Sequence, residues 1–276
     1  MKLSLCNEVI REIEFARQCA MAAEMGYQGL ELAPFTLGED AYRMGAAQRA
    51  AVRRAVTDAG LAVSGLHWLL VAPAGLSITT ADRPTWERTV DVMRRLIELC
   101  AELGGAYLVH GSPGQRRLAG QVDAKEAARR GEAAWAAVAE SATAAKVLYC
   151  IEPLALPEAD FVNTIEEAVA IIRRIAEPCV RTMIDTSAAA QMERLPVADL
   201  VKRWIPTGLI GHVQLNDRNR RGPGQGEDKF TPVLKALRAT NYEGWVAMEP
   251  FDYRPDGPTC AARAIGYVQG ILEGLA

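Results

Sequence analysis

The sequence lacks the features that mark nucleic-acid-binding and membrane proteins. Its formal net charge is −3 over 276 residues, so no overall positive charge attracts nucleic acid or anionic lipid. No apolar run approaches the roughly 20 residues that cross a bilayer, and the opening segment MKLSLCNEVIREIEF has no basic leader followed by an apolar stretch. We therefore expect a cytoplasmic protein whose partner is a small molecule, with no nucleic acid and no membrane involved.

Two common sequence motifs are also missing. The six cysteines contain no CxxC pair and mostly lie in apolar surroundings, which predicts buried reduced thiols rather than disulfides or a zinc knuckle. The segment NEVIREIEF, at the end of the first predicted strand, has no glycine-rich phosphate loop. This absence argues against a doubly wound nucleotide-binding sheet.

What the sequence does have is a regular alternation of short apolar runs and longer helical segments. Each run is rich in aliphatic residues and bounded by Gly, Pro, Asp or Ser, as expected for a strand that is buried on both faces. The predicted strands cover residues 2–7, 29–33, 62–70, 106–112, 147–154, 180–187, 209–217 and 244–251.

Ala-rich amphipathic segments separate the predicted strands, and three of them cover residues 85–103, 123–146 and 164–177. Asp123 and Thr164 are placed to cap the last two, and Glu167 forms a capping box with Thr164. Eight strand and helix repeats without a change in composition predict one (β/α)8 barrel, a TIM barrel, that spans residues 1–276 as a single domain.

Four predicted strands in the second half of the chain end in side chains that offer oxygen to a metal: Glu152, Asp185, Gln214 and Glu249. The carboxyl ends of the strands meet on the face of a TIM barrel that carries its chemistry. Three carboxylates and an amide carbonyl suit one hard divalent ion, Mn²⁺ or Mg²⁺, better than zinc. Each residue alone is more often a helix cap or a rim residue, but four in one register favour a metal site.

Four residues near the predicted strand ends have other expected or alternative roles. Gln214 has an alternative role as a hydrogen-bonding residue of the barrel lining, and we expect the nearby His212 to point to the opposite face, toward the helices. Glu31 is expected to bind backbone groups at the top of the barrel. Glu8 is expected to start the first helix rather than to bind a metal.

The segments around the four predicted ligands resemble those of a known group of proteins. The stretches IEPLALPEADFVNT, MIDTSA, HVQLNDRNRRGPGQG and MEP are similar to those of the xylose-isomerase-like sugar isomerases and epimerases, above all the ketose 3-epimerases and hydroxypyruvate isomerase. The resemblance implies one divalent ion bound by the four residues above. It also implies that Glu158 and Arg220 hold substrate hydroxyls. Ketose epimerases usually have His in place of Gln214 and another His in place of Ala188, so the resemblance leaves the substrate open.

Such a site supports proton transfer next to a carbonyl group. A sugar, ketose or hydroxy-keto acid with adjacent carbonyl and hydroxyl oxygens can chelate the metal, which stabilises the enediolate formed on deprotonation. Glu152 and Glu249 are the predicted catalytic pair, because a carboxylate with one free oxygen is a competent base. Return of a proton to the opposite face of the same carbon epimerises the substrate, whereas return to the adjacent carbon isomerises it. The sequence does not choose between these outcomes.

His67, Trp68 and His110 end the third and fourth predicted strands and are further candidates for substrate binding. Trp68 could close over the apolar face of a sugar, and His110 could hydrogen-bond a hydroxyl. Packing at the top of the barrel is an equal alternative for all three.

Other functional classes remain open. A zinc phosphodiesterase of the endonuclease IV type would share the two histidines, but it would need further histidines where this chain has Ala188 and Gln214. A metal-dependent lyase or dehydratase, including the type that cleaves C-glycosides, would use the same metal and base but expel a leaving group. A non-catalytic sugar-binding subunit is the third alternative. The sequence leaves open whether the chain forms a homo-oligomer.

Overall fold

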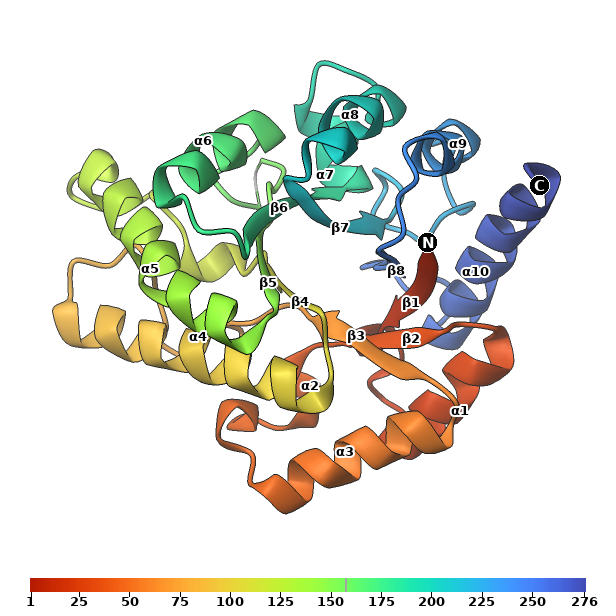
Figure 1. Ribbon diagram of the computed structural model, residues 1–276, viewed down its shortest axis with the longest axis horizontal. Coiled ribbons are helices and arrows are strands. Elements are labelled where there is room, and N and C mark those ends of the chain that lie inside the picture. Colours follow the sequence, from red (N-terminus) through yellow and green to blue (C-terminus); the bar gives the residue numbers. More distant parts are fainter. Residues whose placement is uncertain (157) are drawn as a thin grey trace.

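The computed structural model describes residues 1–156 and 158–276 and shows a closed barrel of eight parallel strands (Figure 1). Each strand pairs with the next along the chain, and β8 closes the barrel by pairing with β1. The strands are β1 Lys2–Cys6, β2 Gly29–Leu32, β3 Ala62–Leu66, β4 Tyr107–His110, β5 Leu148–Ile151, β6 Val180–Asp185, β7 Ile210–Leu215 and β8 Trp245–Met248. This topology confirms the predicted (β/α)8 fold.

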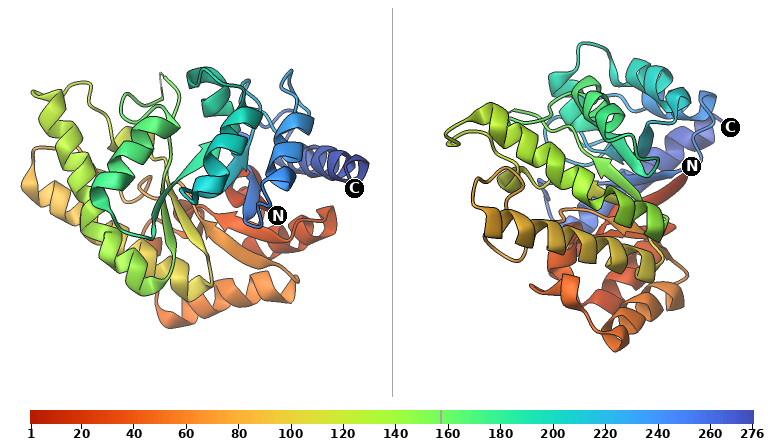
Figure 2. Two further views of the ribbon diagram at one scale, coloured as in Figure 1. Left: turned by 45° about the horizontal axis from the view of Figure 1, so that its top comes forward. Right: turned by 60° about the vertical axis from the view of Figure 1, so that its left-hand side comes forward.

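The helices form a ring around the barrel, and Figure 2 shows this ring from two further directions. The α-helices are α1 Phe15–Met25, α2 Pro34–Leu37, α3 Ala46–Asp58, α4 Arg83–Leu103, α5 Ala124–Ala145, α6 Ile165–Ile175, α7 Thr186–Met192, α8 Val197–Trp204, α9 Thr231–Ala239 and α10 Gly257–Gly274. Short 3-10 helices are η1 Asn7–Ile10, η2 Ala41–Arg43, η3 Pro113–Gln115 and η4 Ile205–Thr207. Within the described ranges, no helix combines the length and apolarity that a bilayer crossing demands.

The predicted N-caps are confirmed, with one shift. Asp123 accepts hydrogen bonds from the first backbone N–H groups of α5, and the Thr164 hydroxyl accepts one from the N–H of Glu167 at 3.2 Å. The Glu167 carboxylate bonds the N–H of Asn163 at 2.6 Å, one residue before the expected partner. Both helices therefore start where the sequence predicts, because their orphan N–H groups find side-chain acceptors.

The observed strands end earlier than predicted. The third ends at Leu66 rather than at residue 70, and the fifth at Ile151 rather than at residue 154. The residues beyond these ends, Leu69 and Leu154 among them, are buried loop residues over the barrel mouth. All six cysteines are free, and five of them are buried, which confirms the prediction of reduced thiols.

A polar layer lies inside the barrel and corrects two expectations. His212 lies inside with Gln214, because residues two apart along a strand share a face; its Nε2 is 2.8 Å from Glu31 Oε2 and its ring stacks on Tyr107. The Glu31 carboxylate accepts hydrogen bonds from the Tyr107 hydroxyl at 2.6 Å and from Gln214 Nε2 at 2.8 Å, so it binds side chains rather than backbone groups. Burial would raise the pKa of Glu31, but the facing histidines outweigh it and lower the pKa, which keeps the carboxylate charged.

Candidate metal and substrate site

Three carboxylates meet at the carboxyl ends of the strands. Oxygen atoms of Glu152, Asp185 and Glu249 lie within 4.8 Å of one another, and all three residues are buried. Glu152 follows β5, Asp185 ends β6 and Glu249 follows β8. Gln214 lies on β7, opposite Asp185 of β6. Strand β7 lies between β6 and β8, which position Asp185 and Glu249. The structure thus brings together the three acidic members of the predicted ligand set.

The cluster favours protonated carboxyl groups when no cation is present. Burial, the largest cause, raises the pKa of Glu249 to about 8, against the lowering influence of His67. Burial also raises the pKa of Asp185 to about 6. The pKa of Glu152 lies well above its usual value because of burial and then the charges of Glu249 and Asp185. A divalent cation would offset the mutual repulsion and displace these protons.

Several buried oxygens of the predicted ligands have no protein partner. Asp185 Oδ1 accepts a hydrogen bond from the Ala188 N–H at 2.6 Å, whereas Oδ2 has no partner among the residues that the structure describes. The same is true of Glu249 Oε2 and of Gln214 Oε1 in the described parts of the chain. Buried polar atoms are normally satisfied. These hard oxygen donors therefore fit a divalent cation. Gln214 remains the predicted fourth ligand, with its amide nitrogen engaged by Glu31.

A cavity of about 210 Å³ opens above the carboxylates. Its lining contains two of the three carboxylates and the predicted substrate residues Trp68, Glu158 and Arg220. The Arg220 guanidinium pairs with Glu158 at 2.8 Å and lies over the Phe251 ring, 5.1 Å from its centroid. The Arg220 carbonyl accepts hydrogen bonds from the N–H groups of Phe251 and Asp252 at 2.7 and 2.8 Å. The cavity therefore has a charged rim over an acidic floor.

Aromatic residues form one wall of this cavity. The Trp68 ring lies 6.2 Å from Phe35 and 6.0 Å from Phe251, measured between centroids. Its indole N–H donates to Glu249 Oε1 at 3.2 Å. Trp68 has a left-handed backbone with φ of 51°, an uncommon conformation for a bulky residue. This backbone conformation occurs at the edge of the site, where strained residues often serve function.

Comparison with known proteins identifies the family of this chain. Residues 19–270 match the family model described as xylose isomerase-like TIM barrel. The chain belongs to this family. Among curated members, a probable ketose 3-epimerase from Synechocystis sp. is 25% identical over 206 residues, which cover 74% of this chain and 70% of that protein. A D-psicose 3-epimerase from Agrobacterium fabrum is 34% identical over 114 residues, which cover 41% of this chain and only 38% of that enzyme.

Solved structures share the fold of this xylose isomerase-like barrel over nearly the whole chain. A D-psicose 3-epimerase crystallised in the presence of D-fructose superposes with a TM-score of 0.82 at 21% identity, covering 99% of both chains. A 3-keto-D-glucoside 4-epimerase from E. coli gives a TM-score of 0.84 at 20% identity, covering 98% of this chain and 99% of that one. At these identities the likeness shows the shared fold alone.

Two residues of this chain that were predicted to bind substrate, His67 and His110, do not line the cavity above the carboxylates. His67 is fully buried, with Nδ1 3.0 Å from Glu249 Oε1 and Nε2 2.9 Å from Glu8 Oε2. His110 Nδ1 is 2.7 Å from the Tyr149 hydroxyl, and its ring packs edge-on against Trp135. Burial, assisted by Arg116, lowers the pKa of His110 to about 3, so its imidazole is neutral. Each histidine thus contacts protein groups, and the predicted contact with substrate remains a prediction.

Sequence reasoning missed two residues that hold Glu152 in place. The guanidinium of Arg116 is fully buried and donates to the carbonyl oxygens of Glu152 at 2.7 Å, Val162 at 3.3 Å and His110 at 3.4 Å. Gly111 leaves room for the Glu152 side chain, because a Cβ at this position would overlap Oε2. The sequence offered no signal for this role, because the adjacent Arg117 carries the same charge and is not buried.

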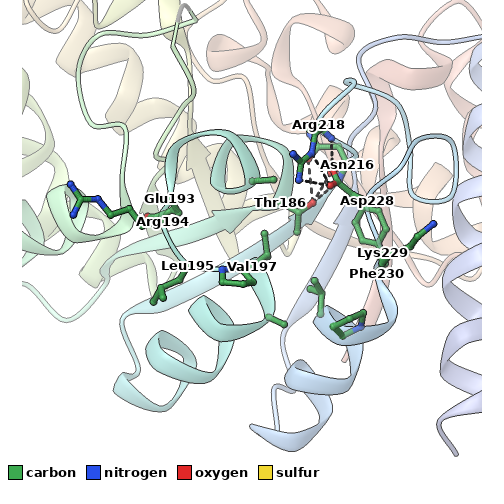
Figure 3. A pocket seen from close by; sticks show the side chains of 15 residues that line it. Thr186, Glu193, Arg194, Leu195, Val197, Asn216, Arg218, Asp228, Lys229 and Phe230 are labelled. Atoms are coloured by element: carbon green, nitrogen blue, oxygen red, sulfur yellow. Dashed lines mark hydrogen bonds and ion pairs between the residues drawn. The ribbon is translucent and has the colours of Figure 1, made fainter.

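A second cavity of this barrel, about 350 Å³ in volume, lies between the regions of α8 and α9 (Figure 3). Thr186 and Asn216 line this cavity, and the Thr186 hydroxyl donates to the Asn216 carbonyl at 2.7 Å. Arg218 and Asp228 form an ion pair on its rim. None of the three clustered carboxylates lines this second cavity. The smaller cavity is therefore the one that combines space for a ligand with reactive groups.

Proposed function

We propose that this member of the xylose isomerase-like family is an epimerase or isomerase of a small sugar, ketose or hydroxy-keto acid, dependent on one divalent ion. The convergence of Glu152, Asp185 and Glu249 beneath a cavity of monosaccharide scale is the observation that carries the proposal. The ketose 3-epimerases among its relatives support a sugar substrate. The oxygen-rich donor set favours Mn²⁺ or Mg²⁺.

The metal would be held by Glu152, Asp185, Gln214 and Glu249. When bound, it would polarise the substrate carbonyl and favour the enediolate. Glu152 and Glu249 are the proposed proton-transfer residues, one for each face of the reacting carbon. Their buried position excludes bulk water, and in the metal-free protein burial raises the pKa of both carboxyl groups above its usual value. A carboxylate with one free oxygen can both take and return a proton.

The rim and wall of the cavity would orient the substrate. The Arg220 and Glu158 side chains lie at the rim with polar groups that substrate hydroxyls can bond in exchange for their mutual ion pair. The Trp68 ring offers an apolar surface to the C–H face of a sugar. These contacts would place the reacting C–H within reach of the carboxylates, which is the condition for general-base catalysis.

Metal content and solvent exchange together test the proposal. The purified protein should contain about one divalent ion per chain, and Asp185→Ala should lose it, because the variant removes one charged ligand. In heavy water the wild type should introduce deuterium into one member of a panel of ketoses and hydroxy-keto acids. Unchanged metal content in Asp185→Ala would contradict the site.

The products of this assay separate the remaining classes. Deuterium in a rearranged sugar supports the epimerase or isomerase, and loss of water or of an aglycone would replace it with a lyase. Absence of both metal and exchange would favour a sugar-binding subunit. Glu152→Gln and Glu249→Gln should each lower turnover by about a hundredfold or more, since each removes a base and keeps the size of the side chain.

A further inference from the structure

The two oxygens of the Glu249 carboxylate have different surroundings. Oε1 lies 3.0 Å from His67 Nδ1 and 3.2 Å from the indole nitrogen of Trp68, so it is anchored by two ring nitrogens. Oε2 has no hydrogen-bond partner among the residues that the structure describes. The protein therefore fixes one oxygen of Glu249 and leaves the other for the shared centre with Glu152 and Asp185.

The anchor extends one residue further, to Glu8. His67 Nε2 lies 2.9 Å from Glu8 Oε2. The ring N–H does not point at this oxygen, so the contact is an ion pair rather than a hydrogen bond. Glu8 is 3% exposed, and neither of its carboxylate oxygens has a hydrogen-bond partner among the described residues. A buried carboxylate is costly unless a cation or donor compensates it. The imidazole of His67 is the compensating group.

The three linked side chains come from three different strand ends. Glu8 lies in η1 after β1, His67 directly follows β3, and Glu249 directly follows β8. Glu8 and His67 lie outside the lining of the cavity above the carboxylates. Their contacts with that site therefore run through Glu249 rather than through a substrate.

A second metal ion is the main alternative explanation. Ligand atoms of Cys6, Glu8, His67 and Glu249 also lie within 4.8 Å of one another. A metal ligand, however, needs the free lone pair of one imidazole nitrogen. Here both nitrogens of His67 face carboxylate oxygens at 2.9 and 3.0 Å. This geometry fits an imidazole that hydrogen-bonds Glu249 and forms an ion pair with Glu8, and the number of Mn²⁺ ions bound per chain tests the second metal.

We propose that Glu8 and His67 are positioning residues that hold Glu249 through Oε1 and so direct Oε2 toward Glu152 and Asp185. The inference rests on the proposed function, because it takes Oε2 as an oxygen that binds the divalent ion. Carboxylates and histidines that hold a ligand from outside the coordination shell commonly contribute about 10-fold to 100-fold to metal affinity.

Substitutions of His67 can keep or remove the contact with Glu249. His67→Asn keeps an N–H group close to the position of Nδ1, whereas His67→Leu removes every donor at similar size. We would titrate Mn²⁺ into each metal-stripped variant by calorimetry. His67→Leu should weaken binding by about 10-fold to 100-fold, and His67→Asn should restore it to within a few-fold of wild type. The buried Ser4→Ala variant on β1 is a control with unchanged affinity.

Glu8 should act only through His67. Glu8→Gln should weaken Mn²⁺ binding less than His67→Leu does, and it should add nothing in the His67→Leu background, since residues in one chain of contacts are non-additive. In turnover, both His67→Leu and Glu8→Gln should lower kcat with little change in KM, because neither residue lines the cavity. A residue that only maintains the fold would lower the melting temperature without this separation.

Four outcomes would overturn the inference. Equal loss in His67→Asn and His67→Leu would mean that the imidazole itself is required. Two Mn²⁺ ions per wild-type chain, with one lost in His67→Leu, would make His67 a ligand of a second metal. An undiminished effect of Glu8→Gln in the His67→Leu background would separate Glu8 from His67. A wild-type protein that binds no divalent ion would refute the proposed function itself, and the positioning role with it.

Discussion

A single methyl group added at Gly111 should displace the catalytic carboxylate of Glu152. A Cβ built on Gly111 would overlap Glu152 Oε2 and lie 3.3 Å from the carboxyl carbon. A carbon and an oxygen normally stay more than about 3 Å apart, so the carboxylate would have to move by roughly 1 Å. The Glu152 side chain can rotate to relieve this contact. The cost should therefore appear in function rather than in folding.

Gly111→Ala should lower both the reaction rate and the affinity for the metal. A displacement of about 1 Å of a reacting group costs on the order of 100-fold in rate, which is about 2.7 kcal/mol in activation free energy. Gly111→Ala should thus lower the rate of deuterium exchange into the best substrate by about 100-fold, and it should weaken Mn²⁺ binding measured by calorimetry. The melting temperature should change by no more than a few degrees.

The same loop supplies the matched control. A Cβ at Gly114 would meet no atom within 4 Å, so Gly114→Ala introduces the same group three residues away without the clash. Gly114→Ala should retain wild-type exchange and metal affinity. Wild-type activity in Gly111→Ala would refute the assigned position of Glu152, and equal losses in both variants would point to the loop rather than to the carboxylate.

Four further predictions concern other parts of the site. Gln214→His should shift metal preference from Mn²⁺ toward Zn²⁺ or Co²⁺ in competition titrations, because imidazole suits softer ions; an unchanged preference would place Gln214 outside the ligand set. Arg220→Ala should raise KM more than it lowers kcat, if the arginine binds ground and transition states alike, and a pure loss of kcat would contradict this. Arg116→Leu should cost roughly 3 kcal/mol in urea unfolding, since it removes three buried hydrogen bonds and leaves the Glu152 carbonyl without its Arg116 donor, and a loss below about 1 kcal/mol would refute the structural role. In the metal-free protein, the pKa of Asp185 is raised to about 6 and that of Glu249 to about 8. Through these two groups the folded chain binds more protons than the unfolded chain above about pH 4, so their contribution should lower the melting temperature as the pH rises from 5 to roughly 8; a flat profile, or no smaller fall in Asp185→Asn, would contradict these assignments.

The fold was predictable because parallel strands buried on both faces appear as continuous apolar runs separated by amphipathic helices. The ends of the strands were not, because apolar residues continue into the loops. Leu69, Leu70 and Leu154 are as buried as strand residues, yet they belong to loops that cover the mouth of the barrel. Composition alone does not distinguish these two kinds of burial.

The convergence of Glu152, Asp185 and Glu249 followed from their common position at strand ends. The partners of these carboxylates did not follow, because a single sequence does not indicate which distant side chains meet. His67 and Glu249 are 182 residues apart in the chain and 3.0 Å apart in space. His212 was misplaced for a simpler reason, since a residue two positions from Gln214 on a strand must share its face.

The backbone bonds between Arg220 and the segment after β8 join two loops that are distant in sequence. One loop supplies the cation of the rim and the other supplies the aromatic ring beneath it. An insertion or deletion in either loop would break the bonds from Phe251 and Asp252 and misplace both groups. Changes of substrate preference in this lineage, or in the laboratory, should therefore require both loops to be exchanged together as one unit.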